Sequence, residues 1–313
     1  MNYLNNKIIE YSKNVLGFDF IEFAKPELLI SEVNYLENWL KHGLHGNMTW
    51  LERNIEKRID VKQILPSTKT VIVLAKNYYN NFQQNDKPDV GKISKYAWGR
   101  DYHKVLGNKL KLLDKFLKEL SENVENKWYV DTGPIMEKQW AVKAGLGWMG
   151  KHTNIITREI GSWIFLSVVL TNLQIDTGSP IEDFCGDCTK CIDACPTDAL
   201  FEPYKLDSNK CISYLTIELK PNLEINPDLS KNFKNWIFGC DICQDVCPWN
   251  KFQKLSEEPD FKPRVNLLNF NLEELLNMEE DEFNLKFEGS PIKRTKHSGI
   301  KRNIESIKVH HKK

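Results

Sequence analysis

Apolar and polar positions along the first half of the chain repeat in patterns that predict both helices and strands. Helical spacing closed by a glycine occurs at 5–17 and at 31–43, and Ser31 is expected to cap the second of these helices. Two further amphipathic helices are predicted over 101–120 and 135–145. Strands are predicted where apolar residues run continuously or alternate, over 18–24, 69–75, 127–131 and, as two strands joined at 159–161, within 153–172.

Helices and strands that follow one another in this way indicate an α+β fold, in which a mixed or antiparallel sheet is flanked by helices. All eight cysteines lie between Cys185 and Cys247, and a charged segment follows them. We therefore expect three units: an α/β domain over 1–175, a cysteine-rich domain over 176–260 and a short helical, basic segment over 261–313.

Composition places the chain among ordinary globular proteins. Hydrophobic residues make up 41% and charged residues 27% of its 313 positions, which excludes wholesale disorder. The N-terminus has no apolar run after a basic patch, and the longest apolar stretch, 163–170, is too short to span a bilayer. These features predict a cytoplasmic protein without a membrane segment. In that compartment, cysteines are metal ligands or redox groups more often than disulfides.

Charge is distributed unevenly near the C-terminus, although the formal net charge is zero. The segment 271–285 has six acids and no base, whereas 286–313 has nine Lys or Arg against two acids. Such a basic segment can contact RNA phosphates, or it can be a solvated terminus. The sequence leaves both interpretations open.

Two cysteine runs, each ending in Cys-Pro, have the spacing of iron–sulfur ligands. The first run matches the C-x2-C-x2-C-x3-C-P pattern of bacterial ferredoxins. The second run lacks its first cysteine, because Ile237 occupies that position. In two-cluster ferredoxins the cysteine before the proline ligates the other cluster, so the two runs should exchange their last cysteines. Cys211, the one cysteine outside the two runs, would then complete the ligands of the second cluster.

The predicted ligand sets use all eight cysteines for two 4Fe-4S clusters. The alternative is a pair of zinc sites. Zinc knuckles usually place two cysteines close together, whereas here three lie within seven residues. The clusters are predicted to carry electrons, since the C-x3-C-x2-C run of radical enzymes is absent. The first set is Cys185, Cys188, Cys191 and Cys247, and the second set is Cys195, Cys211, Cys240 and Cys243.

Two other motifs are misleading. The glycines of 145–150 spell G-x-G-x-x-G, but a helical segment precedes them and a strand-like segment follows, which argues against dinucleotide binding. We interpret them as a loop whose backbone approaches something flat or bulky. The segment 101–107 nearly matches a D-x-H-x-x-G cobalamin motif, but it has one residue too many. An ordinary helix start, with Asp101 near the N-terminal dipole, is the simpler interpretation.

Asp131 follows a predicted strand and precedes a Gly-Pro turn. A turn aspartate and a catalytic aspartate are equally compatible with this spacing.

Seven blocks, in order from about residue 35 to residue 305, resemble the epoxyqueuosine reductase family. This family is related to reductive dehalogenases. The resemblance implies a nitroreductase-like cobalamin-binding domain followed by a ferredoxin-like domain with two 4Fe-4S clusters. It also implies reduction of the epoxide of epoxyqueuosine, at the tRNA wobble position, to queuosine. The blocks are HGNMTWLERN, YAWGRDYHK, VDTGPIMEK, AGLGWMGKHTN, CGDCTKCIDACPTDAL, CISYLTIEL and GCDICQDVCPWN.

The resemblance also implies roles for individual residues. Asp131 would donate a proton and contact the cofactor, while Asp101 and His103 would face the substrate. His103 is therefore not expected beneath the cobalt, and cobalamin is expected in its base-off form without a protein ligand. The remaining residues that would line the cobalamin are Arg53, Lys151, His152, Ser213, Cys240 and Asp241.

The expected partners are a tRNA carrying epoxyqueuosine in its anticodon and an external one-electron reductant, and the chain is expected to act as a monomer. Many family members continue well beyond the position matching Lys313 in a helical-repeat tail, so RNA binding here would depend on the cofactor domains and the basic segment. Two rival hypotheses are a dehalogenase-like reductase of a small molecule, which needs no RNA, and a plain ferredoxin-type electron carrier, which needs no corrinoid.

Overall fold

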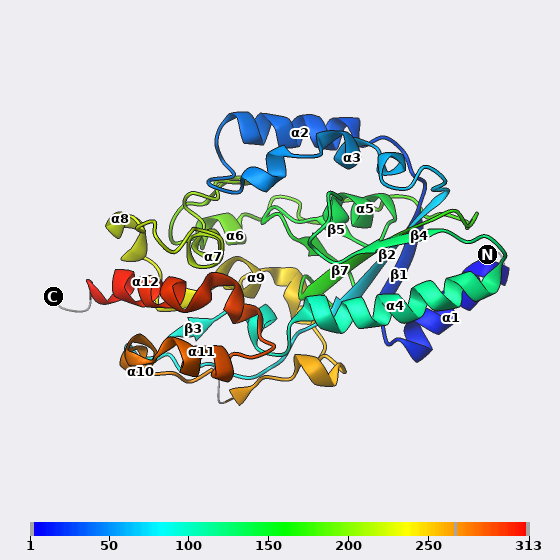
Figure 1. Ribbon diagram of the computed structural model, residues 1–313. Coiled ribbons are helices and arrows are strands. Elements are labelled where there is room, and N and C mark those ends of the chain that lie inside the picture. The colour runs from blue at the N-terminus through cyan, green and yellow to red at the C-terminus, as the bar shows by residue number, and fades with distance from the viewer. Residues whose placement is uncertain (1–2, 266–267, 311–313) are drawn as a thin grey trace.

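The computed structural model describes residues 3–265 and 268–310. Its central element is a four-stranded sheet in which the strands follow the order β1-β2-β7-β4 and every neighbouring pair is antiparallel (Figure 1). The long strands β2 and β7 pair over eight residues, from Thr70 opposite Thr171 to Asn77 opposite Ile164. The four strands are β1 (Phe20–Ala24), β2 (Thr70–Asn77), β4 (Asn126–Tyr129) and β7 (Ile164–Thr171).

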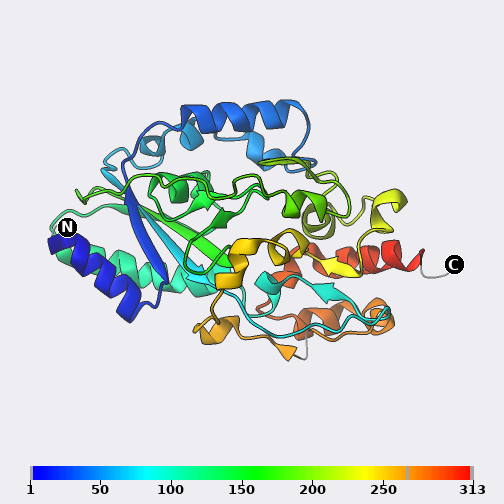
Figure 2. The same cartoon turned by 180° about the vertical axis from the view of Figure 1, so that it is seen from behind.

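Helices cover both faces of this sheet. Alternate side chains of β2 point to opposite faces, so Ile72 packs with one helix layer and Val73 with the other. Figures 1 and 2 show α1 and α4 on one side of the sheet and α2, α3 and α5 on the other. The bounds are α1 (Tyr3–Glu10, continued by a π-helical turn at Tyr11–Val15), α2 (Ile30–Lys41), α3 (Ile55–Ile59), α4 (Tyr102–Leu120) and α5 (Glu137–Lys143).

The predicted elements of the first half are present, with one difference. The sheet is antiparallel, which is one of the two predicted alternatives, and the only parallel pairing among the described residues is between the short strands β3 (Lys92–Ile93) and β10 (Trp236–Phe238). Ser31 does not cap its helix, because α2 already starts at Ile30 and the Ser31 hydroxyl bonds the Glu32 carboxylate. The hydrophobic stripe of α4 is complete, since Leu106, Leu110, Leu113 and Leu117 are all fully buried.

The cysteine-rich segment consists of loops and short helices beside one end of the sheet. A second hydrophobic core joins it to the C-terminal segment and also to Ile93 and Trp98 from the first half. Packing therefore crosses the predicted boundaries at 175 and 260, because β3 pairs with β10 far along the chain. The elements here are β3 (Lys92–Ile93), α6 (Lys190–Asp193), β8 (Leu200–Glu202), β9 (Lys205–Leu206), α7 (Ile212–Ile217), α8 (Pro227–Ser230), β10 (Trp236–Phe238) and α9 (Ile242–Asp245).

The basic C-terminal segment is folded into this second core. Ile300, Ile304 and Ile307 lie one turn apart on α12 and are buried. The Asn303 side chain donates to the carbonyls of Thr216 and Ile237, which ties α12 to the cysteine-rich segment. The interpretation as a solvated terminus is therefore wrong for residues 293–310. The helices are α10 (Leu272–Asn277), α11 (Glu280–Lys286) and α12 (Lys296–Lys308).

The glycine run at 145–150 leads into a short hairpin of β5 (Trp148–Met149) and β6 (Ile155–Ile156), not into a helix. A Cβ at Gly147 would lie 2.3 Å from the carbonyl oxygen of Ile156. The close approach at Gly147 is thus to the chain's own backbone, and a flat or bulky neighbour of this loop stays a prediction. No helix in the described ranges is long and apolar enough to cross a membrane.

Candidate active site and cluster-binding loops

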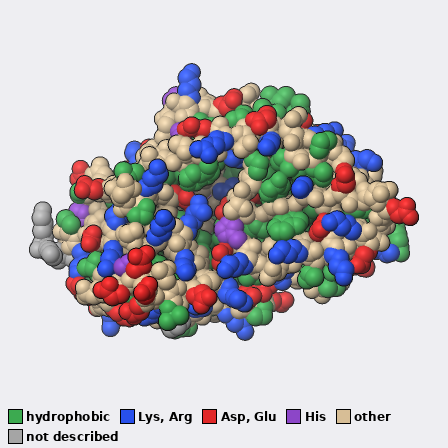
Figure 3. Space-filling view, in the orientation of Figure 1, with side chains coloured by type: hydrophobic (Ala, Val, Ile, Leu, Met, Phe, Trp, Pro, Cys, Tyr) green, Lys and Arg blue, Asp and Glu red, His purple; other side chains and the backbone are tan. Residues whose placement is uncertain are grey.

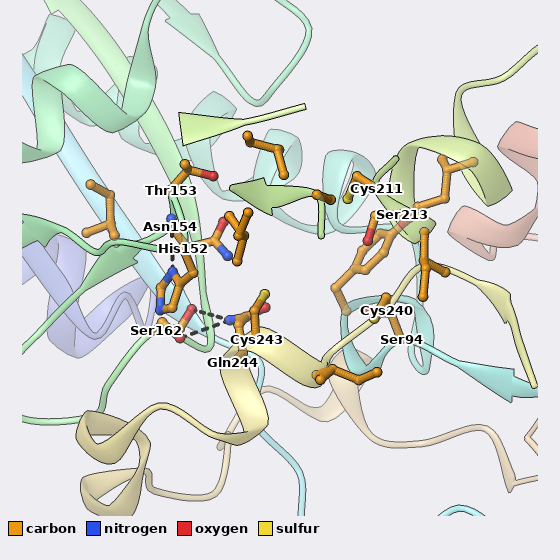
Figure 4. Close-up of a pocket in the computed structure, with 18 of the residues that line it drawn as sticks. Ser94, His152, Thr153, Asn154, Ser162, Cys211, Ser213, Cys240, Cys243 and Gln244 are labelled. Atoms are coloured by element: carbon orange, nitrogen blue, oxygen red, sulfur yellow. Dashed lines mark hydrogen bonds between the residues drawn. The ribbon is translucent and has the colours of Figure 1, made fainter. Parts of the chain in front are cut away.

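A cavity of about 410 Å³, here called the central cleft, lies between strand β7 and the cysteine-rich loops. One wall comes from Ile164 and Phe165 of β7, and another from the loop that carries His152 (Figure 4). The beginning of α7 supplies Ser213 on the side across from His152, and α9 supplies Gln244 beside Ser162 (Figure 4). Segments from residues 152–165, α7 and α9, which are far apart in sequence, therefore enclose one space.

All four cysteines of the predicted second set line the central cleft, and none of the first set does. Burial is the main factor that raises the pKa of the Cys240 and Cys243 thiols, and the other cysteines of the set raise it further. Four bare thiolates would therefore be unfavourable here, and bound metal would be needed to hold their charge. The cysteines of the second set are Cys195, Cys211, Cys240 and Cys243.

The first set gathers at the other side of the loops. Burial first, and then the neighbouring Cys247, Cys185 and Cys188, raise the pKa of Cys191 to about 11. Burial, and then Cys188, raise the pKa of the Cys247 thiol. These mutual effects fall within the predicted sets, apart from an influence of Cys191 on Cys243 where α6 and α9 meet.

His152 presents an unpaired donor to the central cleft. Burial, and then the charge of Lys138, lower its pKa to about 4, so the ring is neutral. Its Nδ1 accepts a 3.2 Å hydrogen bond from the Asn154 amide, as Figure 4 shows, which places the ring proton on Nε2. Within the described part of the chain, this buried Nε2 has no partner. His152 therefore lines the cleft and carries a donor without an acceptor among the described residues.

A second cavity, here called the outer cavity, has a volume of about 670 Å³ and contains Asp101, His103 and Arg294 in its lining. Tyr102 and Asp131 line both the outer cavity and the central cleft. Figure 3 shows a hollow near the middle of this face of the molecule, with Lys and Arg side chains along its rim. Asp131 thus stands where the two cavities meet.

Local backbone structure holds Asp131 in place at the end of β4. Its φ of +60° lies in the left-handed region, which aspartate tolerates better than most residues. Gly133 is needed two positions later, because a Cβ there would lie 2.1 Å from the Tyr129 ring. The structure thus places Asp131 in a turn, while its catalytic role stays a prediction.

Asp131 and His103 form an ion pair at neutral pH. Burial alone would raise the pKa of Asp131, but His103 and Tyr102 outweigh this effect and lower it. Burial alone would lower the pKa of His103, but Asp101 and Asp131 outweigh this effect and raise it to about 9. His103 Nδ1 lies 2.8 Å from Asp101 and its Nε2 lies 3.5 Å from Asp131. The proton therefore resides on the imidazole and Asp131 is ionised.

Asp101 has the structural role that the sequence indicated, since its carboxylate accepts a hydrogen bond from the backbone amide of His103 and caps α4. It also fixes the orientation of the His103 ring. Both residues line the outer cavity but not the central cleft.

Three residues predicted to line the cobalamin lie outside the lining of both cavities. Arg53 is exposed after a 3-10 turn. Lys151 is buried and donates to the carbonyl of Gly186 in the first cysteine loop. Asp241 is buried behind the cleft, where it accepts hydrogen bonds from the Ser94 hydroxyl and the Lys95 amide. The structure gives Lys151 and Asp241 positioning contacts.

Sequence reasoning missed several residues of the site. Tyr102 donates to Asp131, and its position between Asp101 and His103 was the available signal. Glu137 lines the central cleft, and burial raises its pKa to about 7. Lys138 lines the cleft as well, and it donates to the carbonyl of Thr153. No spacing rule marked these last two residues, because they face the cleft only through the way α5 packs on the sheet.

Comparison with known proteins places this site in a family. The epoxyqueuosine reductase of Cellulophaga algicola is 44% identical over 293 residues, which cover 94% of both chains. The chain belongs to the epoxyqueuosine reductase family. The family model described as epoxyqueuosine reductase QueG, DUF1730, matches residues 58–132, and that of a 4Fe-4S double cluster binding domain matches residues 184–250. The second match contains all eight cysteines, with Cys211 between the two runs.

Solved epoxyqueuosine reductases share the whole fold. A crystal structure with an epoxyqueuosine-modified stem loop of tRNA-Tyr has a TM-score of 0.91 and 34% identity, and the match covers 99% of this chain and 82% of that one. The enzyme from Bacillus subtilis, with an aspartate-bearing catalytic loop swung out of the active site, has a TM-score of 0.90 and 32% identity over the same shares. The predicted family, fold class and cluster-binding segment are confirmed.

Proposed function

We propose that the protein reduces the epoxide of epoxyqueuosine, at the wobble position of a tRNA, to the cyclopentene of queuosine. The position of Asp131 carries this proposal, because it lies between the cleft lined by the second cysteine set and an outer cavity that opens on a basic face. Family membership supports the same reaction. The reaction consumes two electrons and two protons, and it releases the epoxide oxygen as water.

The eight cysteines would hold two 4Fe-4S clusters in the sets predicted above. Their mutual charge effects and their distribution between two sides of the loops support this division. Bound clusters supply electrons one at a time. The second set is the one that borders the central cleft, so its cluster would be the one next to the reaction.

The central cleft suits a corrinoid because it combines an apolar wall with unpaired polar groups. His152 Nε2 would donate to an amide carbonyl on the corrinoid edge, and Ser213 and the Cys240 backbone would line the ring. When bound, cobalamin supplies a low-valent cobalt that can attack carbon or transfer electrons. The contacts from Arg53, Lys151 and Asp241 stay predictions.

We further propose that cobalamin binds in the base-off form without a protein ligand. His152 is the histidine in the central cleft, and its Nε2 carries the ring proton, so it has no free lone pair for cobalt. His103 lies in the outer cavity between Asp101 and Asp131. Neither imidazole is therefore available beneath the metal.

Asp131 would deliver a proton to the departing oxygen, and His103 would supply it. A carboxylate with a lowered pKa is a poor donor at rest, but the imidazolium beside it carries a proton at neutral pH. Tyr102 holds the same carboxylate oxygen through a 2.6 Å hydrogen bond. These three side chains can therefore keep a proton at the boundary of the two cavities.

The tRNA would approach through the outer cavity. Lys293 and Arg294 line it, and Arg294 is fixed by two hydrogen bonds to Glu218. We also propose that an external one-electron reductant supplies the electrons and that the protein acts as a monomer. We propose no membrane partner.

The direct test is anaerobic turnover by the reconstituted protein of a stem loop carrying epoxyqueuosine, with dithionite as electron source. Mass spectrometry of the nucleosides should show the loss of one oxygen atom. Turnover of a halogenated phenol, with none of the stem loop, would instead favour a dehalogenase-like reductase. Failure of the cluster-loaded protein to bind cobalamin would favour an electron carrier.

A further inference from the structure

A third cavity lies on the opposite side of the cysteine loops from the reaction. This basic cleft has a volume of about 650 Å³, and Cys247 of the first set is in its lining. No cysteine of the second set lines it, just as none of the first set lines the central cleft. The second set and Cys247 of the first set therefore border two different cavities. The central cleft belongs to the proposed active site, whereas the basic cleft is not part of it.

Positive charge gathers around the basic cleft. Its lining includes Lys92, Lys95, Lys190 and Lys251, but only the acids Asp86 and Asp245. Lys92 pairs with Asp86 at 2.5 Å, and Lys95 pairs with Asp245 at 2.8 Å.

Two exposed lysines of this lining, Lys190 and Lys251, have no ion-pair partner among the described residues. Arg158 nearby is exposed and equally unpaired within the described ranges, and its guanidinium lies over the Phe184 ring at 4.0 Å. Arg158, Lys190 and Lys251 therefore each present a positive charge that no acidic side chain of the described residues pairs with.

Aromatic side chains connect this surface to the first cysteine set. Phe252 is 43% exposed, and Lys251 lies over its ring at 4.7 Å. The Phe252 ring lies 5.8 Å from that of Trp249, which in turn lies 4.8 Å from Trp148. Trp249 and Trp148 pack with Cys247 and Cys185. A short apolar path thus leads from an exposed aromatic ring to two thiols of one set.

We propose that this entry surface, formed by Arg158, Lys190, Lys251 and Phe252, docks a small acidic protein that carries a one-electron redox centre. Charge complementarity selects an acidic partner, and the exposed ring supplies an apolar contact at the point nearest the first cysteine set. The inference rests on the proposed function, because it assumes a cluster at that set. It gives the external one-electron reductant a binding site on this protein and a chemical class.

The electron balance is simple. At each docking event the reduced carrier loses one electron and the cluster of the first set gains one, with no bond made or broken. Two such events supply the two electrons that, with two protons, convert the epoxide to an alkene and water. The carrier reaches neither the central cleft nor the outer cavity, so it need not leave before tRNA binds.

The test uses the full, cluster-loaded chain and an acidic 2Fe-2S ferredoxin as the probe. Reduction of the clusters by reduced ferredoxin is followed by stopped-flow absorbance, and binding of oxidised ferredoxin is measured by calorimetry at several salt concentrations. Arg158→Glu with Lys251→Glu should slow reduction by about tenfold or more, because like charges would then oppose the encounter. The variant should also weaken ferredoxin binding and flatten its salt dependence. Phe252→Ala should weaken binding without changing the salt slope.

Two controls distinguish a loss of docking from a loss of the clusters or of the fold. Dithionite, a small reductant, should reduce the clusters of every variant at the normal rate, and iron content should be unchanged. The matched charge change Lys111→Glu with Lys115→Glu, on exposed positions of α4, should leave ferredoxin reduction and binding at the normal values. Equal ferredoxin kinetics and binding in the entry-surface variant and the native chain would overturn the proposal. So would an entry-surface variant whose reduction by dithionite slows by the same factor as its reduction by ferredoxin.

These readouts need neither tRNA nor epoxide. Failure of docking therefore leaves the proposed reaction intact, since dithionite-driven turnover of the modified stem loop tests that reaction separately. Failure of dithionite-driven turnover, with ferredoxin still bound at the entry surface, would reject the substrate and keep the docking site.

Discussion

The hydroxyl of Tyr102 donates a 2.6 Å hydrogen bond to the carboxylate of Asp131, which lies 29 positions further along the chain. The bond joins the first turn of α4 to the end of β4. It also joins the two cavities, because both residues line both spaces. With His103 at 3.5 Å from the same carboxylate oxygen, the bond holds Asp131 beside a charged imidazole. These contacts therefore keep a protonated imidazole next to the Asp131 carboxylate.

Replacing Asp131 with Asn should keep both clusters, cobalamin and stem-loop affinity while turnover falls by about 10²- to 10⁴-fold, the usual contribution of a positioned acid. The amide has nearly the same shape but cannot pass on a proton. Single-turnover mass spectrometry of the cofactor-loaded variant measures the loss. Tyr102→Phe is a useful comparison, since it removes one hydrogen bond and leaves the carboxylate. Nearly normal turnover by the Asn variant would make His103 or a water molecule the donor.

Turnover should fall as pH rises through about 9, because His103 then loses the proton it holds between Asp101 and Asp131. The folded-state pKa is raised above the ordinary value, so the imidazolium contacts stabilise the fold fully below about pH 6.5, and this contribution is lost as pH approaches 9. Rate profiles against pH for the native chain and His103→Gln provide the measurement. An alkaline limb at the same position in the Gln variant would assign the titration to another group.

Native protein should contain about eight irons per chain, and Cys211→Ala should lose half of them while keeping the spectrum of the first cluster. Cys185→Ala is the matched variant and should lose the first cluster instead. Iron analysis and electron paramagnetic resonance at low temperature distinguish the two cases. Equal loss of both clusters in Cys211→Ala would contradict the division of ligands, though not the clusters themselves.

Basic residues at the rim of the outer cavity should contribute to tRNA affinity. Deleting 293–313 would remove the buried side chains of α12, so the informative change is Lys293→Gln, in the lining of the outer cavity, with Lys296→Gln, an exposed position at the start of α12. For each lysine that neutralises a phosphate, its replacement should reduce the slope of log affinity against log salt by about 0.7 to 0.9. Filter binding of the stem loop at several salt concentrations measures this slope. The exposed pair Lys111→Gln and Lys115→Gln on α4 provides the control, and an unchanged slope in the rim variant would exclude phosphate binding there.

The packing of α12 can be tested through stability. Ile304 is fully buried in the second core, so Ile304→Ala should lower the free energy of unfolding by about 2 to 5 kcal/mol. Glu305→Ala, at the exposed neighbouring position, should change it by about 0.5 kcal/mol or less. Urea denaturation of the two variants gives both values. Equal stability of the two would mean that α12 does not pack against this core.

Much of the first domain could be predicted from local pattern. Strand β2 is a continuous apolar run because both faces of the sheet are covered, and α4 shows its stripe because only one face is buried. The cysteine runs were equally readable, since cluster ligands need fixed short spacings. The helix start at Ile30 was misjudged, because Ser31 has a capping residue type without the capping position.

Local pattern determined the elements, the cluster-binding runs and Asp131 as a candidate, because each depends on residues that are close together in sequence. Only the tertiary structure decided that β3 pairs with β10, that α12 belongs to a core, and that Tyr102 and His103 meet Asp131. It also decided that the second cysteine set borders the central cleft while Cys247 of the first set borders the basic cleft. These contacts join residues that are far apart in the sequence. They depend on burial and strand pairing across the whole fold, so no pattern of neighbouring residues predicts them.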